Sequence, residues 1–219
     1  MSLKLYFAPG ACSFVPHCLL EASGAPYEPV LVKLHKQENY SDAFKAINPR
    51  SQVPVLLDGE QAITQIVAIV LHLDASLPGG VLPAAGLARS RAIETLAWMN
   101  NTVHPTFTHI YLPHKFTDKP ELHGELKAYN TQLYRGLLAE LEGLALALRQ
   151  RGDRWLAGGS RVGPLDVYAL TLLRWGTIAG IDPATFPALW AHVQTVAADA
   201  AVARVIERER LQLNFHQPA

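Results

Sequence analysis

Residues 3–24 read LKLYFAPGACSFVPHCLLEASG, and this stretch decides the fold of the first part of the chain. The apolar run from Leu3 to Phe7 predicts a buried strand, and Pro9-Gly10 predicts the turn that ends it. The apolar residues after the turn predict a helix over 13–23, which the next glycine closes. Cys12 and Ser13 therefore stand where a helix starts beside the end of a strand.

The residues that follow alternate between strand and helix patterns. They predict a strand over 27–32, a helix over 42–47, a hairpin of 53–57 and 61–64, and a helix over 65–75. The hairpin turns at Asp58-Gly59, a dipeptide that favours tight turns. This order of elements is typical of a small α/β sheet with a parallel βαβ half and an antiparallel half.

Prolines and glycines are densest between residues 77 and 86. We interpret this stretch as the junction of two domains, with an N-terminal domain over 1–78, a linker over 79–86 and a C-terminal domain over 87–219. Beyond the linker, apolar residues recur at three- and four-residue spacing over 87–111, 122–150, 165–178 and 187–207. This spacing predicts an all-α C-terminal domain.

The composition excludes several classes of protein. Apolar residues make up 49% of the 219 residues and charged residues 17%, which argues against a disordered or fibrous chain. Lys and Arg together number 19, as do Asp and Glu, so the near-zero net charge argues against nucleic acid or an anionic membrane surface as a partner. No run approaches the roughly 18 apolar residues of a membrane-spanning helix.

The first residues and the cysteines indicate a compartment. Pro9 and Gly10 interrupt the first apolar run, so we do not expect a secretion signal there. The two cysteines, Cys12 and Cys18, are too few for a disulfide framework, and their spacing matches no zinc or paired-cysteine redox motif. We therefore expect a cytoplasmic protein without a metal site.

The helix start at Cys12 and Ser13 is a candidate functional site. Free backbone N–H groups and the positive end of the helix dipole favour anions there. A thiolate of Cys12 or of a ligand would have its pKa lowered from the roughly 8.5 of a free cysteine. The alternative is that Ser13 only caps the helix and Cys12 packs as a small apolar residue. For Cys18, deeper in the helix, packing is the favoured interpretation.

Two positions of the predicted hairpin and its following helix also have functional interpretations. A cis proline at Val53-Pro54 would turn the preceding backbone outward as an edge for an extended peptide, whereas the commoner trans isomer would be an ordinary strand start. The helix start at Gln65-Ile66 could hold a carboxylate on its free N–H groups, with the Gln65 amide beside it.

Several motifs together resemble those of the bacterial beta-class glutathione transferases, over essentially the whole chain. They are the Pro-Gly-Ala-Cys-Ser turn at 9–13, the Asn-Pro-Arg-Ser-Gln-Val-Pro run at 48–54, Ala68-Ile69, His104-Pro105 with Phe107, and Asp166 with Arg174-Trp175. The resemblance implies a thioredoxin-like N-terminal domain, an all-α C-terminal helical domain and a homodimer. It also implies glutathione as co-substrate in a cleft between the domains, and no other cofactor.

The resemblance implies where glutathione lies. Pro54 would be cis, and the Val53 backbone would pair with the cysteinyl part of glutathione, with Gln52 among the binding residues. The γ-glutamyl carboxylate would rest on Gln65-Ile66, and Lys36 would approach the glycyl end.

The resemblance also assigns the chemistry. Cys12 and Ser13 would face the sulfur as catalytic residues, and His104 would come close to Cys12 from the helical domain. Asn101 is included among the substrate-binding residues. The candidate walls of a pocket for a small apolar electrophile are Phe14, Phe107, Tyr111 and Trp175, although aromatic residues at helical spacing are also typical of plain core.

Some residues depart from the family pattern. Gln65-Ile66 lacks the serine that many relatives have, and the lost hydroxyl hydrogen bond would weaken glutathione binding by roughly 1 to 3 kcal/mol. Ala97 stands where relatives often have an asparagine that reaches across the dimer, and Pro105 replaces a common lysine. Gly163 replaces a hydroxyl helix cap, while Asp166 is still expected to bond backbone at that helix start.

The residues and the resemblance together lead to three hypotheses for the function. The first is conjugation of glutathione to small apolar electrophiles, for which detoxification is one implied role. The second is a glutathione-dependent thiol–disulfide reductase that acts through Cys12. The third is a non-catalytic binding protein that kept the fold, motivated by Ile66 and Ala97.

Overall fold

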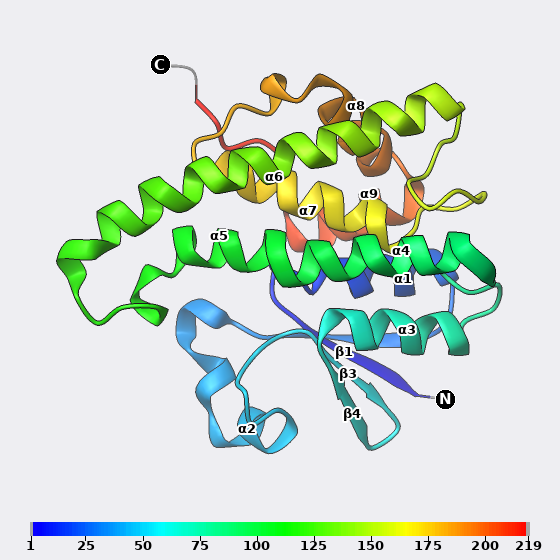
Figure 1. Cartoon of the computed structure of the whole chain (residues 1–219). Helices are drawn as coiled ribbons and strands as arrows, with labels where there is room; N and C mark the ends of the chain where they lie inside the picture. Colours follow the sequence, from blue (N-terminus) through cyan, green and yellow to red (C-terminus); the bar gives the residue numbers. More distant parts are fainter. Residues whose placement is uncertain (1, 218–219) are drawn as a thin grey trace.

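The N-terminal part of the chain is a four-stranded sheet with helices on both faces (Figure 1). The computed structural model describes residues 2–217. Its first elements are β1 (Leu3–Phe7), α1 (Phe14–Ser23), β2 (Tyr27–Leu31), α2 (Asp42–Ile47), β3 (Val55–Asp58), β4 (Gln61–Thr64) and α3 (Ile66–Ser76). This is the predicted order of strands and helices, and the thioredoxin-like fold is confirmed.

The strands lie in the order β2-β1-β3-β4, with β1 parallel to β2 and the other neighbours antiparallel. Side chains alternate between the two faces of β1. Leu5 packs in the large core beneath α1 and α3, whereas Tyr6 packs with Phe44 of α2 on the opposite face. The sheet therefore holds α1 and its preceding loop at one end of β1.

The C-terminal part is helical, as the spacing of apolar residues predicted. Its helices are α4 (Gly86–Trp98), α5 (His104–Tyr111), α6 (His123–Arg151), α7 (Pro164–Ile178), α8 (Pro187–Ala197) and α9 (Ala200–Glu209). Helix α7 is buried along almost its whole length and contacts α1, so that one large core joins both parts of the chain. Residues 77–85, between α3 and α4, form neither helix nor strand.

Two helices differ from the prediction. The helix expected over 87–111 contains a π-turn at Met99–Val103, in which the His104 amide donates to the Met99 carbonyl five residues earlier. The helix expected over 187–207 is divided, because the Asp199 side chain accepts hydrogen bonds from the first amides of α9 and starts a new helix there. Apolar spacing alone reveals neither a π-turn nor a break between two helices.

The start of α7 confirms the expected role of Asp166. Its Oδ2 accepts a hydrogen bond of 2.9 Å from the Gly163 amide, and its Oδ1 accepts one of 2.8 Å from the Leu156 amide. The same oxygen lies 3.0 Å from His192 Nε2 of α8. The buried carboxylate therefore caps α7 and ties it to the preceding loop and to α8.

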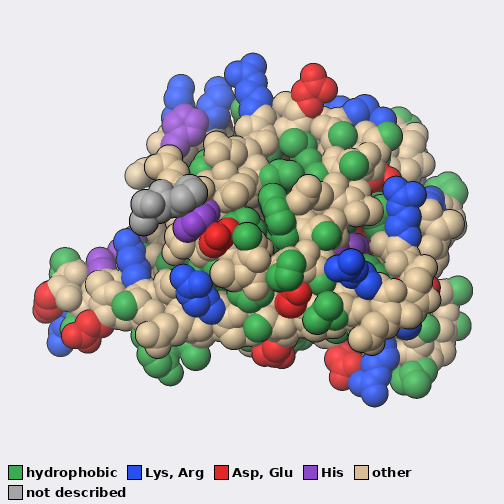
Figure 2. All heavy atoms as spheres, turned by 90° about the horizontal axis from the view of Figure 1, so that it is seen from above, with side chains coloured by type: hydrophobic (Ala, Val, Ile, Leu, Met, Phe, Trp, Pro, Cys, Tyr) green, Lys and Arg blue, Asp and Glu red, His purple; other side chains and the backbone are tan. Residues whose placement is uncertain are grey.

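The surface agrees with the even charge balance of the sequence. Figure 2 shows the face over the C-terminal helices, where Lys and Arg side chains are interspersed with Asp and Glu among apolar ones. None of the described helices has the length and apolar character needed to cross a bilayer.

Candidate active site

A cavity of about 410 Å³ lies between the N-terminal part and helices α5 and α7. Its N-terminal wall is formed by the loop before α1, the turn before β3 and the start of α3. Its other wall is formed by the π-turn, α5 and the end of α7. The cavity therefore collects residues that are far apart in the sequence.

Cys12 lies in this cavity, where the loop from β1 reaches α1. Its thiol donates to the Val53 carbonyl, with a sulfur–oxygen distance of 3.7 Å. Burial raises the pKa of the Cys12 thiol to about 12, although the backbone N–H groups of Cys12 and Ser13 act in the opposite direction. The expected lowering of the Cys12 pKa is therefore wrong, because desolvation outweighs the helix start, and Cys12 is a thiol at neutral pH.

Ser13 also differs from its expected position. Its hydroxyl is fully buried, accepts from the Ala8 amide at 3.1 Å and donates to the Ala8 carbonyl at 3.2 Å. It neither lines the cavity nor caps α1. Ser13 instead fastens the end of β1 to the start of α1, because these two backbone groups are the partners within reach of its side chain.

The Val53-Pro54 peptide is cis, as the family resemblance implied. Gln52, Val53 and Pro54 line the cavity. Two buried asparagines hold this turn, since Asn48 Nδ2 donates to the Gln52 carbonyl at 2.7 Å and Asn39 Nδ2 donates to the Ser51 carbonyl at 2.8 Å. The sequence interpretation assigned neither asparagine to the site, although Asn48 begins the run at 48–54, and both line the cavity.

The start of α3 faces the same cavity. Gln65 has a φ of 73° and a ψ of 129°, and its side chain makes no capping bond to α3. Few L-residues adopt this backbone conformation, and it costs on the order of 1 to 3 kcal/mol. The Ile66 side chain points into the core and is 3% exposed. The cavity therefore meets the backbone of this helix start and the Gln65 side chain.

His104 lines the cavity from the helical side, immediately after the π-turn. Its Nδ1 lies 2.8 Å from the Tyr168 hydroxyl, which in turn donates to Asn100 Oδ1 at 3.4 Å. Burial lowers the pKa of His104 to about 4, so the ring is neutral at neutral pH.

Three aromatic residues form a continuous stack along the helical wall. The Phe107 ring lies 4.8 Å from the Trp175 ring and 5.6 Å from the Tyr111 ring, with interplanar angles of 16° and 14°. All three line the cavity. The structure thus brings together the three predicted aromatic residues of the helical part. Phe107 and Trp175 are each 5% exposed whereas Tyr111 is 61% exposed, so Tyr111 is the end of the stack that an apolar molecule can reach.

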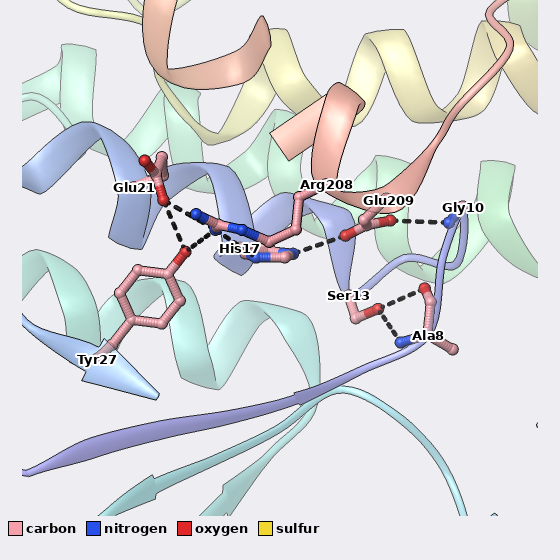
Figure 3. A network of polar contacts seen from close by, with 8 residues as sticks. All are labelled: Ala8, Gly10, Ser13, His17, Glu21, Tyr27, Arg208 and Glu209. Atoms are coloured by element: carbon pink, nitrogen blue, oxygen red, sulfur yellow. Dashed lines mark hydrogen bonds and ion pairs between the residues drawn. The ribbon is translucent and has the colours of Figure 1, made fainter. Parts of the chain in front are cut away.

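A buried polar network joins the C-terminal helix to the loop that carries Cys12 (Figure 3). The Glu209 carboxylate accepts from the Gly10 amide at 2.9 Å and lies 2.6 Å from His17 Nδ1. The Gly10 carbonyl accepts from Trp175 Nε1 at 2.9 Å. The Gly10 peptide is therefore held from both sides by residues of the C-terminal part.

The network continues away from the cavity. Arg208 Nη1 lies 3.2 Å from His17 Nε2 and donates to Glu21 at 2.9 Å and to the Tyr27 hydroxyl at 2.7 Å (Figure 3). These contacts tie α1 and β2 to the end of α9. One sign of this contact is visible in the sequence, because His17 and Glu209 are polar residues at otherwise apolar positions of their helices. They are 192 residues apart, so the sequence does not indicate that they pair.

Comparisons with known proteins agree with this geometry. The model of the glutathione S-transferase N-terminal domain matches residues 1–75. The glutathione S-transferase GST-4.5 of Xanthomonas campestris pv. campestris is 32% identical over 215 residues, which cover 95% of this chain and 100% of that protein. This chain belongs to the glutathione S-transferase superfamily.

Solved glutathione S-transferases share the whole fold. A sphingomonad glutathione S-transferase complexed with glutathione is 31% identical, with a TM-score of 0.79 over 95% of this chain and 100% of that chain. The bacterial beta-class glutathione S-transferase of Sphingomonas chungbukensis is 28% identical, with a TM-score of 0.80 over the same shares of both chains. The resemblance to beta-class transferases is therefore confirmed.

Three residues expected at the site lie elsewhere in the structure. Lys36 is exposed and does not line the cavity. Asn101 is exposed as well, and the π-turn presents Asn100 to the cavity instead. Phe14 is 1% exposed in the core, because α1 directs it beneath the sheet rather than toward the cavity.

Proposed function

We propose that this protein conjugates the thiolate of glutathione to small apolar electrophiles. The observation that carries the proposal is the division of the cavity into two unlike walls that meet at Cys12. One wall offers backbone groups, namely the edge at Val53 and the start of α3. The other wall offers the aromatic stack. Peptide and electrophile would therefore lie side by side.

Glutathione would bind along Gln52, Val53 and Pro54, with its γ-glutamyl carboxylate at Gln65-Ile66. Its sulfur would lie near Cys12, where the amides of Cys12 and Ser13 favour a negative charge. Since Cys12 is protonated, its thiol can donate to the glutathione thiolate, and neutral His104 borders the same space. The thiolate attacks the electrophilic carbon, the sulfur–carbon bond forms, and the leaving group departs with its bonding electrons.

The first experiment is a calorimetric titration of the protein with reduced glutathione, followed by a conjugation assay with chloro- and nitro-aromatic electrophiles. We expect saturable binding and turnover. Absence of binding at millimolar glutathione would contradict the proposal and would favour the non-catalytic alternative, which Ile66 and Ala97 motivated. The Cys12→Ala variant in the same titration reports how much Cys12 contributes to binding.

A second candidate function is thiol–disulfide exchange through Cys12, which its place in the cavity favours. The raised pKa of Cys12 opposes it, since the thiolate is the nucleophile. We expect Cys12→Ser to retain conjugation and to abolish any reduction of a glutathione mixed disulfide. Cys18→Ser is the matched control for removal of a cysteine. Reductase activity that survives in Cys12→Ser would end this second candidate.

We also propose that the protein is a cytoplasmic homodimer. Both cysteines are free thiols, which suits a reducing compartment. Leu87 on α4 and Tyr129 and Leu133 on α6 are exposed apolar residues that a second copy could cover. Sedimentation analysis tests the assembly, and a monomer at micromolar concentration would contradict the dimer.

A further inference from the structure

The charges of the cavity are all of one sign. Two cationic side chains, Lys115 and Arg174, line it, and among residues 2–217 no Asp or Glu does so. His104 adds no charge at neutral pH, because burial lowers its pKa to about 4. The position of these two cations relative to the two walls decides whether they face glutathione or the electrophile.

Both cations belong to the electrophile side of the cavity. Lys115 ends the short helical turn Pro113–Lys115 directly after α5, which carries Phe107 and Tyr111. Arg174 precedes Trp175 on α7. The backbone edge at Val53 and the start of α3, where glutathione is proposed to bind, form the opposite wall.

Arg174 lies close to the reacting position. Its Nη1 and Nη2 are 2.7 Å and 3.0 Å from the point where a side-chain carbon on Gly10 would stand, two residues before Cys12. Its Nε donates to the Gln212 carbonyl at 2.8 Å, and its Nη1 reaches the Gly10 carbonyl at 3.4 Å. Within residues 2–217, Nη2 has no hydrogen-bond acceptor, so one edge of the guanidinium retains donors for a ligand.

Lys115 supplies a second, mobile charge. Its side chain is exposed, and the described part of the chain places no carboxylate within ion-pair distance of its ammonium. A lysine and a planar arginine that line one cavity suit a carboxylate held at the edge of a stacked ring, because arginine orients the group and lysine adds attraction.

We infer that the electrophile this protein favours is a planar, aromatic molecule that carries a carboxylate, with its ring against Tyr111, the exposed end of the aromatic stack, and its carboxylate within reach of Lys115 and Arg174. The inference rests on the proposed function and narrows its substrate class. In the test reaction below, the sulfur–carbon bond forms at the chlorinated carbon, chloride leaves with the bonding pair, and the thiol proton goes to solvent.

The test uses two acceptors that differ only in the carboxylate, 4-chloro-3,5-dinitrobenzoate and 1-chloro-2,6-dinitrobenzene. Each kcat/KM is divided by the rate constant of the uncatalysed reaction with glutathione, which removes the electronic effect of the carboxylate. We expect the benzoate to show about a tenfold larger enhancement, as for a charge-assisted hydrogen bond. Equal enhancements would overturn the inference and leave the proposed function intact.

Variants of Lys115 test whether this residue causes the larger rate enhancement with the benzoate. Lys115→Met should bring the ratio of the two enhancements close to one, Lys115→Arg should keep most of it, and Lys119→Met, an exposed lysine outside the cavity, is the matched control. A ratio that stays unchanged in Lys115→Met while the KM for glutathione rises would assign Lys115 to glutathione and would overturn the inference.

A binding measurement separates the inference from the proposed function. If neither acceptor is turned over, the proposed function fails. Calorimetry with the unreactive pair 3,5-dinitrobenzoate and 1,3-dinitrobenzene then decides the inference. Tighter binding of the benzoate, lost in Lys115→Met, supports an anion-selective aromatic site, whereas equal binding of the two molecules overturns it.

Discussion

The two walls of the cavity are built from different kinds of chemical groups. The N-terminal wall presents mainly backbone, with the Val53 carbonyl, the helix starts at Cys12 and Gln65, and two asparagines that hold the turn. The helical wall presents side chains, namely an aromatic stack and two cations. Backbone groups are set by the fold and suit a ligand common to the family, whereas exchangeable side chains suit a variable acceptor. Truncation of a side chain should therefore affect the two walls differently.

The largest effect is expected where the two walls are joined. Glu209→Ala removes the acceptor of the Gly10 amide and leaves His17 without its carboxylate partner. Each of the two buried donors left without an acceptor should lower the free energy of unfolding by about 1 to 3 kcal/mol. Chemical denaturation measures it, with the exposed Glu207→Ala as control. Similar losses in both variants would show that the network does not join the two parts.

The next largest effect is a dependence of the free energy of unfolding on pH, which arises from His104 in the helical wall. His104 has a folded-state pKa of about 4, below its ordinary 6.5, so the unfolded chain takes up a proton first as the pH falls. Its stabilising contribution is complete above pH 6.5 and is lost progressively between pH 6.5 and 4, up to about 3 kcal/mol.

Denaturation curves of the protein and of His104→Phe at several pH values isolate this contribution. The variant should lose less stability than the parent between pH 6.5 and 4, because it lacks the titrating group. Parallel curves would mean that the imidazole is hydrated in the folded chain. The raised pKa of Cys12 places its ionisation above this range.

A smaller effect should show that the two walls bind different ligands. Phe107→Leu removes the centre of the aromatic stack but retains an apolar side chain. We expect kcat/KM for an aromatic acceptor to fall by about tenfold, as for the loss of two aromatic pairs, with little change in the dissociation constant of glutathione. Phe14→Leu, in the core away from the cavity, is the matched control. A comparable loss of glutathione affinity in Phe107→Leu would argue against separate walls.

The smallest effect concerns the backbone wall. Gln65→Gly relieves the unusual backbone conformation at φ 73° and should raise the free energy of unfolding by about 1 kcal/mol. It also removes an amide from the proposed carboxylate site, so glutathione should bind more weakly. Thermal unfolding and calorimetry measure the two effects. A variant that is both more stable and equally able to bind glutathione would show that Gln65 is not a ligand.

The local features of the fold follow from the sequence with few exceptions. The strand-turn-helix of residues 3–24, the hairpin and the Asp166 cap are short-range patterns, and each depends on residues close together in the chain. The helical part was predicted in outline. The π-turn, which presents Asn100 instead of Asn101 to the cavity, and the division between α8 and α9 were not predicted. A π-turn changes which residues share a helix face, and apolar spacing does not report it.

The family, the order of elements and the aromatic wall could be predicted from the amino-acid sequence, because these depend on local patterns and on motifs that stand together in the chain. The protonation of Cys12, the inward direction of Ser13, the hydrogen bonds that hold Gly10 and the charge of the cavity became apparent in the folded structure. A pKa depends on all the atoms that exclude water from a group, and Glu209 meets His17 across 192 residues. Both properties depend on residues that are far apart in the sequence and come together only when the chain folds.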